Sequence, residues 1–446
     1  MRELTSSRVL VLGLGVSGRS AANFCAARGA KVVAADERPA AEIGSLEAVD
    51  AAVELSVGCP FPDPGAFDLV VPSPGVPEER YRGRARCVWG DVELAYRALA
   101  VPVIAVTGTN GKSTTALLTE AMLRASGFRA QAAGNLGLPA LELVGAALDF
   151  AVLEVSSFQL ATVDSFRPAV SVVLNITPDH LDRHGDLDRY VHAKTRIVAN
   201  QQADDVAVLN FDDGRVRALA HETKARIYPF RCSGPAPGGG WLDSSSAVLT
   251  DAAGQARRVS LEGMRLAGSH NRENALAALA AAAAVGADLE RAGAALAVFT
   301  GLPHRSQVVG QLGDVTYVDD SKATNAGAAM RSLTGFAERV VWIAGGRDKG
   351  LDFTDLADAA ARRARAAVLI GEATAKLEQA LADRIEVRRA DSIEDAVRIA
   401  TELAGGRGVV LLAPACASYD QFRDFSERGE RFQQAVQALI GRGSQS

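Results

Sequence analysis

Residues 107–115 read TGTNGKSTT, and this stretch contains the clearest chemical signal in the 446-residue chain. It follows the apolar run Val103–Val106, which predicts a buried strand, and precedes the helical pattern of Ala116–Arg124. A strand, a glycine-rich turn and a helix in this order are typical of a phosphate-binding loop. The glycines let backbone N–H groups turn towards phosphate oxygens, and the helix N-terminus adds a favourable dipole.

Side chains of the same loop fit a nucleotide carrying Mg²⁺. Lys112 would place a positive charge beside the outer phosphates, and Ser113 or Thr114 would offer a hydroxyl to the metal ion. The generic pattern G-x-x-x-x-G-K-[ST] is not met, because its first position is Val106. A glycine-rich turn with a solvent-facing lysine is the alternative, but the strand–helix context favours nucleotide binding.

Short apolar runs alternate with helix-length segments through most of the chain, which predicts α/β units around mostly parallel sheets. The runs expected to be strands are Val9–Leu12, Lys31–Ala35, Val103–Val106, Phe150–Leu153, Val170–Leu174, Val206–Leu209, Val340–Ala344, Val368–Ile370 and Val409–Ala413. Composition changes near 94–102 and 300–304 predict three domains, at 1–97, 98–301 and 302–446. The Gly-, Pro- and Ser-rich segment 232–260 is expected to form loops and a β-hairpin within the middle domain.

Polar residues follow two of the strands expected beside the phosphate loop. Glu154 ends the run Phe150–Leu153, and a carboxylate at such a strand end can reach nucleotide-bound Mg²⁺ or stay solvated. His180 follows Val170–Leu174 and is a candidate metal ligand or hydrogen-bond partner, although a lone histidine is usually structural. Lys194 lies in a helical pattern and by itself reads as a solvated lysine.

The first domain contains GLGVSG at residues 13–18, between an expected strand and helix, with Asp36 ending the next strand. This spacing fits the dinucleotide fingerprint G-x-G-x-x-G, but the same turn can bind any diphosphate. Ser73-Pro74-Gly75-Val76 ends a further strand and either completes that pocket or forms a plain turn.

Asn271 and Asn274 share one face at the start of an Ala-rich helix, where helix capping and ligand contact are both open. In the last domain, charged and polar loops follow three expected strands. Because such strand ends meet at one edge of a sheet, these loops predict a shared ligand face. They are residues 319–325, 345–350 and 414–422.

Composition excludes several classes of function. The formal net charge of −5 argues against a nucleic-acid partner, which normally selects a basic surface. The five cysteines include no C-x-x-C pair, which fits a reducing cytosol without a disulfide framework or a zinc site. The N-terminus lacks the apolar stretch of a signal peptide, and no apolar run predicts a membrane span. We therefore expect a soluble, cytoplasmic protein.

Taken together, these motifs resemble the Mur ligase family over essentially the whole chain. The resemblance rests on TGTNGKST at 107–114, Gly134-Asn135-Leu136-Gly137, Glu154–Gln159, Leu302–Arg305, Asp320–Asn325 and Ala415–Phe425, with Arg428-Gly429 beyond. It implies an α/β fold of three domains: a Rossmann-like UDP-binding domain, a central P-loop ATPase domain with a mostly parallel sheet, and a C-terminal Rossmann-like domain that binds an amino acid.

The family resemblance implies an ATP-dependent ligase of peptidoglycan precursor synthesis, and so of cell-wall formation, cell shape and division. Its substrates would be UDP-N-acetylmuramoyl-L-alanine and D-glutamate, joined through an acyl phosphate, and the enzyme is expected to be a monomer. Another Mur-type or folylpolyglutamate-type ligase, a nucleotide-switched binding protein and an NAD dehydrogenase are the alternatives. The UDP-type first domain disfavours the folate enzyme, and the phosphate loop disfavours the dehydrogenase.

The resemblance also assigns residues to each ligand. The UDP substrate would contact Gly13, Leu14, Gly15, Val16, Ser17, Asp36, Arg38, Ser73, Gly75, Asn135 and His180. ATP would contact Gly108, Thr109, Asn110, Gly111, Lys112, Ser113, Thr114, Asn271, Asn274, Arg305 and Asp320. D-glutamate would contact Lys322, Thr324, Lys349, Ser418 and Phe425.

Catalysis would depend on Lys112, Glu154, His180 and Lys194. Two Mg²⁺ ions would lie among Ser113, Glu154, His180 and Lys194, with Lys194 carrying a CO₂-derived carbamate. A carbamate is chemically reasonable there, because it converts an ammonium that cations repel into an anionic ligand.

Overall fold

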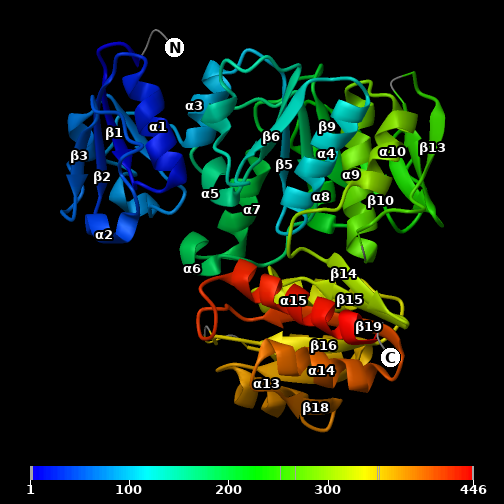
Figure 1. Cartoon of the computed structure of the whole chain (residues 1–446). Coiled ribbons are helices and arrows are strands. Elements are labelled where there is room, and N and C mark those ends of the chain that lie inside the picture. The colour runs from blue at the N-terminus through cyan, green and yellow to red at the C-terminus, as the bar shows by residue number, and fades with distance from the viewer. Residues whose placement is uncertain (1–3, 252, 267, 349, 351, 444–446) are drawn as a thin grey trace. The chain divides into compact units, whose positions relative to one another are not determined.

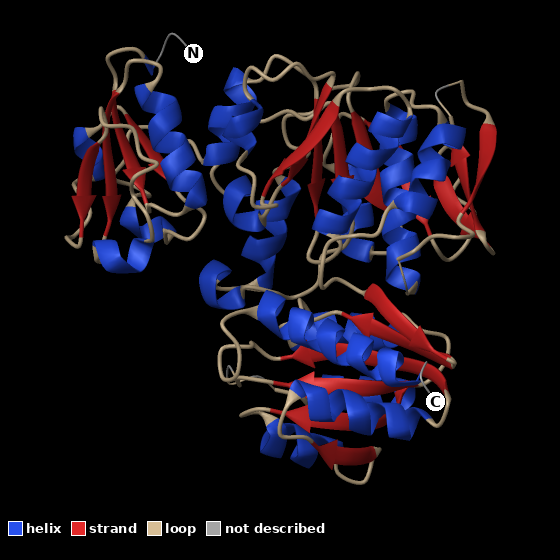
Figure 2. Cartoon of the chain, viewed as in Figure 1, coloured by secondary structure: helices blue, strands red, loops and turns tan. Residues whose placement is uncertain are grey.

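The computed structural model describes residues 4–251, 253–266, 268–348, 350 and 352–443. The chain forms two compact units, Met1–Ser260 with Ala275–Ala295 and Leu261–Asn274 with Leu296–Ser446. Two sheets, of four and nine strands, belong to the first unit, and a six-stranded sheet belongs to the second. Figures 1 and 2 show these sheets flanked by helices.

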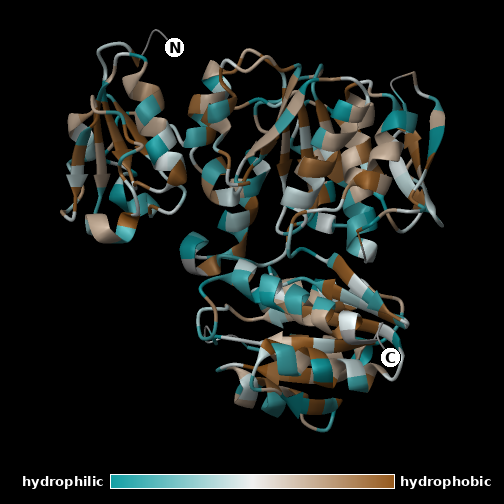
Figure 3. Ribbon diagram, in the orientation of Figure 1, coloured by the Kyte–Doolittle hydropathy of each residue, from teal (hydrophilic) through white to brown (hydrophobic). Residues whose placement is uncertain are grey.

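The four-stranded sheet is parallel and has the strand order β3-β2-β1-β4. Its strands are β1 (Arg8–Leu12), β2 (Lys31–Asp36), β3 (Glu54–Val57) and β4 (Leu69–Pro72), and its helices include α1 (Val16–Ala26), α2 (Ala40–Ile43) and α3 (Asp91–Ala98). The central strand β1 buries Val9 to Leu12 completely. Strands covered on both faces have such continuous apolar runs, shown in brown in Figure 3.

The nine-stranded sheet has the order β13-β12-β11-β10-β9-β8-β5-β7-β6 and is parallel from β6 to β11. Strand β12 is antiparallel to both β11 and β13, so the hairpin expected within 232–260 is confirmed. The strands are β5 (Val103–Thr107), β6 (Ala130–Gly134), β7 (Phe150–Glu154), β8 (Val170–Val173), β9 (Val206–Asn210), β10 (Arg226–Arg231), β11 (Gly240–Asp243), β12 (Ser246–Thr250) and β13 (Ala256–Ser260).

Helices of this part are α4 (Lys112–Ala125), α5 (Ser157–Leu160), α6 (Leu181–His184), α7 (Leu187–Thr195), α8 (Gly214–Ala218), α9 (Ser269–Ala284) and α10 (Leu289–Val298). Residues Ala275 to Ala283 of α9 are all buried, which fits a helix that is apolar all round. Small alanine side chains allow other elements to pack closely on every side of it.

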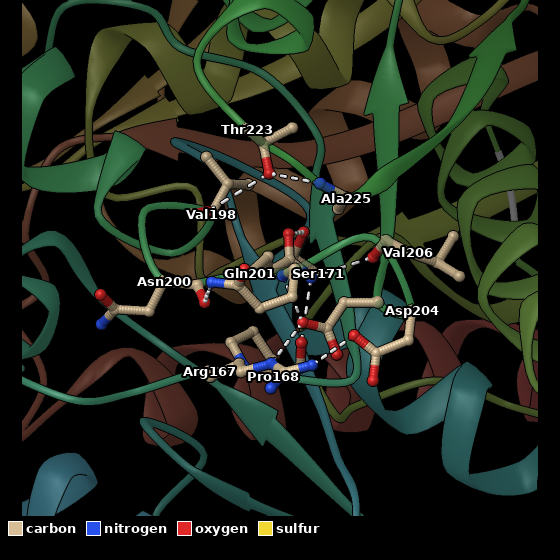
Figure 4. A network of polar contacts seen from close by, with 12 residues as sticks. Arg167, Pro168, Ser171, Val198, Asn200, Gln201, Asp204, Val206, Thr223 and Ala225 are labelled. Carbon is tan, nitrogen blue, oxygen red and sulfur yellow. Dashed lines mark hydrogen bonds and ion pairs between the residues drawn. The ribbon is translucent and has the colours of Figure 1, made fainter.

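A buried glutamine ties the amino-terminal ends of β8 and β9 together, away from the carboxyl ends where ligands bind in parallel sheets (Figure 4). The Gln201 amide donates to the carbonyls of Pro168 (3.0 Å) and Val206 (3.1 Å) and accepts a hydrogen bond from the Ser171 hydroxyl at 2.9 Å. Because every one of these groups is paired, the network holds the scaffold rather than a ligand.

The six-stranded sheet of the second unit has the order β14-β15-β19-β16-β17-β18, and only β14 is antiparallel. The strands are β14 (Gln307–Leu312), β15 (Asp314–Asp319), β16 (Val340–Gly345), β17 (Ala364–Ile370), β18 (Glu386–Arg389) and β19 (Arg407–Ala415). Residues of α11 (Ala326–Thr334), α12 (Thr354–Arg363) and α13 (Thr374–Leu381) pack into one core, and residues of α14 (Ile393–Ala404) and α15 (Phe425–Gly443) into the other.

The α/β class with mostly parallel sheets is confirmed, and each of the nine predicted runs falls on an observed strand. Seven agree with the observed ends to within one residue, whereas Val368–Ile370 starts four residues late in β17 and Val409–Ala413 is two residues short at each end of β19. The boundaries at 97/98 and 301/302 stay predictions. Among the described residues, no helix has the length and apolar character needed to cross a membrane.

Candidate functional site

The phosphate loop connects β5 to α4 and depends on two glycines. Gly108 has φ +157°, and a Cβ there would lie 3.0 Å from the Leu174 Cβ; Gly111 has φ +87°, a left-handed conformation that favours glycine. The Asn175 side chain braces the loop by accepting from the Asn110 N–H at 2.9 Å and donating to the Asn110 carbonyl at 3.1 Å. The loop is therefore held in shape before any ligand binds.

Two lysines converge on one carbonyl of this loop. Lys112 Nζ donates to the Gly108 carbonyl at 3.0 Å, and Lys194 Nζ, from α7, donates to the same oxygen at 2.7 Å. Lys194 is 1% exposed, so the expectation for an isolated helix lysine does not hold here. Burial, and then the positive charge of Lys112, holds the pKa of Lys194 well below its usual value.

Glu154 is a buried carboxylate at the carboxyl end of β7. Its Oε1 accepts from the Asn135 Nδ2 at 2.8 Å, whereas Oε2 has no hydrogen-bond partner among the residues that the structure describes. Gly134, just before Asn135, has φ +96°, and a Cβ there would lie 2.3 Å from the Glu154 carbonyl oxygen. Since a buried carboxylate oxygen is costly without a partner, this atom is suited to a cation.

The other expected metal-site residues differ in their exposure. Ser113 and Thr114, in the first turn of α4, are buried beside the loop. His180 precedes α6 in a left-handed conformation (φ +52°), and its half-exposed ring contacts the Phe158 ring edge-on at 5.1 Å. Within the described ranges no three His, Cys, Asp or Glu side chains form a cluster that could hold a metal ion by themselves.

The glycine-rich turn of the first sheet has the tight packing that its fingerprint predicts. A Cβ on Gly18 would lie 1.8 Å from the Gly13 carbonyl, so only glycine fits there, whereas nothing lies within 4 Å of a Cβ on Gly15. Ser73 Oγ donates to the Gly13 carbonyl at 2.9 Å, which brings the loop after β4 against this turn. The predicted neighbours Gly13 and Ser73 are therefore adjacent in the structure.

Asp36, at the end of β2, is already engaged by the protein. It accepts from the Leu14 N–H at 2.8 Å and from the Arg38 guanidinium at 3.0 and 2.8 Å. These bonds, that of Arg38 first, lower the pKa of Asp36 to about 2. In the NAD fingerprint the corresponding acid bonds a ribose hydroxyl, and here Arg38 occupies its oxygens instead.

A pocket of about 370 Å³ lies beside Ser73 in the first unit. Its lining includes Arg82, Arg183 and Arg196 as well as Phe158. No ligand contact was predicted for the three arginines, because isolated arginines have no motif.

Of the ATP-binding residues expected in the second unit, Asn271 and Asn274 are buried, whereas Arg305 and Asp320 are partly exposed. Asn274 Nδ2 donates to Asn271 Oδ1 at 3.1 Å, so the two asparagines pair with each other. Asp320, after β15, accepts from the Ser306 N–H at 3.1 Å and from the Ser332 hydroxyl. Burial raises the pKa of Asp320 to about 6. Arg305 lies in the loop before β14, next to two residues with positive φ.

The residues expected around the amino acid lie partly together. Lys322 Nζ lies 3.9 Å from the centre of the Phe425 ring, and Ser418 is buried in the loop after β19. Thr324 lies in the loop before α11, where its N–H donates to the Lys322 carbonyl. Lys349 lies outside the described residues.

Two residues that support the phosphate loop, Asn175 and Tyr190, were not predicted to contact it. Tyr190 OH is 2.9 Å from the Thr109 hydroxyl, and the Asn175 side chain bonds Asn110. Each partner is at least 65 positions away in the sequence, so no local pattern could have paired them.

Comparison with known proteins places these features in a family context. The family model "Mur ligase MurD-like, N-terminal domain" matches residues 7–82, "Mur ligase middle domain" matches 106–282, and "Mur ligase, glutamate ligase domain" matches 304–416.

Curated relatives match over nearly the whole chain. The chain is 41% identical to a UDP-N-acetylmuramoylalanine–D-glutamate ligase of Geotalea daltonii, covering 98% of this chain and 99% of that protein. It is 43% identical to the enzyme of the same name in Anaeromyxobacter dehalogenans, over 96% and 97% of the two chains. Among solved structures, UDP-N-acetylmuramate-alanine ligase from Thermotoga maritima covers 97% of this chain and 100% of its own, with a TM-score of 0.59 at 18% identity, and so shares the fold.

Proposed function

The chain belongs to the Mur ligase family, an ATP-dependent ligase family, and from that premise we propose that it joins D-glutamate to UDP-N-acetylmuramoyl-L-alanine. The reaction forms ADP and phosphate through an acyl-phosphate intermediate, in peptidoglycan precursor synthesis. One observation carries the activity class: Lys112 and Lys194 both donate to the Gly108 carbonyl of the phosphate loop. The positive charge of Lys112 at this loop would stabilise the charge that develops during phosphoryl transfer.

The loop residues Gly108 to Thr114 would bind the phosphates of ATP. Backbone N–H groups at the start of α4 would orient the phosphates, and Lys112 would exchange its loop carbonyls for the outer phosphate oxygens. On the second unit we assign ATP contacts to Asn271, Asn274, Arg305 and Asp320, because two of these side chains are buried and Asn274 Oδ1 has no partner among the described residues.

Mg²⁺ would be held by Glu154 and Ser113, with His180 and a modified Lys194 nearby. The unpartnered Oε2 of Glu154 is the observation that supports this set, since Mg²⁺ prefers oxygen ligands together with nucleotide phosphates. When bound, the metal supplies positive charge that offsets the charge of the phosphoryl group. We propose two ions and a carbamate on Lys194, whose burial beside Lys112 disfavours a second ammonium there.

The UDP part of the acceptor would bind at residues 13–17, with Asp36, Arg38, Ser73 and Gly75 around it and Asn135 and His180 towards the reacting end. The open space beside Gly15 supports this assignment, because a diphosphate must approach the backbone closely. The alanyl carboxylate then attacks the γ-phosphorus and ADP leaves.

The amine of D-glutamate then attacks the acyl carbon, and phosphate leaves as the amide bond forms. Lys322, Thr324, Lys349, Ser418 and Phe425 would hold D-glutamate. We propose that the enzyme acts as a monomer in the cytoplasm, where ATP is available, and sedimentation of the purified protein checks the oligomeric state.

The deciding experiment is ATP-dependent phosphate release with UDP-N-acetylmuramoyl-L-alanine and one added amino acid. D-glutamate, L-glutamate, L-lysine and diaminopimelate are tested separately. Release only with D-glutamate is the expected result. Release with a different amino acid would move the substrate but keep the family, whereas release that needs no amino acid would overturn ligation.

A further inference from the structure

Arg428 is a fully buried arginine in the first turn of α15 (Phe425–Gly443). This position is doubly unfavourable. A buried cation loses its hydration, and a cation at a helix N-terminus opposes the helix dipole. No carboxylate lies within ion-pair distance of it in the part of the chain that the structure describes.

The guanidinium instead contacts three loops that follow three neighbouring strands. Nε donates to Ser321 Oγ at 3.0 Å and Nη2 to the Ser321 carbonyl at 2.9 Å, after β15. Nη1 donates to the Gly345 carbonyl at 3.4 Å, at the end of β16, and to the Cys416 carbonyl at 3.2 Å, after β19. Each acceptor is an uncharged oxygen, and the carboxylates of Asp420 and Asp319 act on the guanidinium only from beyond ion-pair distance.

The same three loops carry the residues assigned to the amino acid. Ser321 is adjacent to Lys322, Cys416 and Ala417 precede Ser418, and the Ser321 hydroxyl donates to the Phe425 carbonyl at 2.8 Å. The loops are also bonded to one another, because the Arg347 N–H donates to the Ala417 carbonyl and the Ala415 N–H to the Ala323 carbonyl, both at 2.8 Å. A Cβ on Gly346 would lie 2.2 Å from the Ala417 carbonyl and 3.1 Å from Arg428 Nη1, so no side chain fits between these loops at this position.

We propose that Arg428 is a positioning residue for the amino-acid site, which ties the three loops into one surface and so fixes the side chains that bind the amino acid. The inference rests on the proposed function for the identity of that amino acid. A planar fork with five donors suits this task, because it can bond three loops at once.

The first test needs no substrate. Amide hydrogen exchange is compared in the full-length wild-type protein, Arg428→Gln, Arg428→Lys and a matched control, Arg431→Gln, on the same helix but exposed and paired with Glu394. Exchange at Arg347 and Ala415 should rise by about tenfold or more in Arg428→Gln, less in Arg428→Lys and not in the control. Unchanged exchange in Arg428→Gln would overturn the proposal.

The second test separates KM from kcat in phosphate release. The KM for D-glutamate should rise about 30-fold in Arg428→Gln. It should rise about 10-fold in Arg428→Lys, which keeps the positive charge but loses the planar guanidinium with its several donors. In both variants the KM values for ATP and the UDP substrate should stay within about threefold of wild type. An equal rise of all three KM values would reduce Arg428 to a structural residue and refute the proposal. Absence of D-glutamate-dependent release in the wild type would instead refute the proposed function, and the exchange result would stand separately.

Discussion

Glu154 and Glu93 are two buried glutamates with different partners, and exchanging each for glutamine separates the proposed metal role of the first from the structural role of the second. Glu154 accepts one side-chain hydrogen bond, from Asn135, and leaves Oε2 without a partner among the described residues. Glu93 accepts from the N–H groups of Asp164, Ser165 and Phe166 at 2.9, 3.0 and 3.1 Å, and from the Arg97 guanidinium.

The expected magnitudes follow from these partners. Glu154→Gln keeps the oxygen that Asn135 needs and removes only the charge, so stability should change by less than about 1 kcal/mol. Turnover should fall about 10²- to 10³-fold, as it does when a charge that stabilises the transition state is lost. Glu93→Gln turns an NH₂ group towards several donors and should lower the free energy of unfolding by about 3 kcal/mol, with turnover within about threefold of wild type.

The assays are urea unfolding followed by fluorescence, and phosphate release at saturating ATP, UDP-N-acetylmuramoyl-L-alanine and D-glutamate. Glu93→Gln is measured at a temperature where it is fully folded. Near-normal turnover of Glu154→Gln would refute the assignment of its free oxygen to the metal. Equal loss of turnover in both variants would show that burial of the charge, rather than its position, matters.

Three further outcomes are expected. Lys194→Met keeps the buried volume but cannot carry a carbamate, so phosphate release should fall about 10²-fold or more; release within threefold of wild type would contradict this. The pKa of Asp320 is raised to about 6 in the folded protein. Its contribution to the free energy of unfolding is therefore fully present below about pH 3.9 and is lost as the pH rises through 6. Urea unfolding at several pH values should show this loss in the wild type and not in Asp320→Asn. Gly18→Ala would place a methyl group 1.8 Å from the Gly13 carbonyl and so distort the glycine-rich turn. The KM for the UDP substrate should then rise at least tenfold, while the KM for ATP stays constant. Equal changes of the two KM values would contradict the UDP assignment.

Sequence patterns predicted those elements that are determined by residues close together in the chain. The apolar runs of β1, β5, β7, β8 and β9 are buried on both faces, and such runs stand out against polar loops. The phosphate loop was predictable because its glycines, lysine and hydroxyls are adjacent in the chain. The edge strands β13 and β18 were not predicted. Most of their residues are exposed and several are charged, so their sequences contain no apolar run that would indicate a strand.

The partners of the site residues were less predictable, because they lie far apart in the chain. Lys194 and the Gly108 carbonyl are 86 positions apart, and Arg428 and Ser321 are 107 apart. A helix lysine is solvated in most proteins, so its burial here follows only from the packing of α7 beside the loop. The family resemblance, rather than local physics, pointed to Lys194 before the structure did.

Lys194 and Arg428 show why the chain uses different cations at two buried places. Burial holds the pKa of Lys194 well below its usual value, and an amine that loses its proton is a nucleophile that can take up CO₂. Burial lowers the pKa of Arg428 only to about 10, so its guanidinium keeps its charge at neutral pH. The proposed carbamate needs a side chain that can become neutral, whereas the proposed tie between three loops needs a side chain that keeps all of its donors. Lys194→Arg and Arg428→Lys should therefore fail for opposite reasons: the first variant cannot be modified, and the second cannot bond three loops at once.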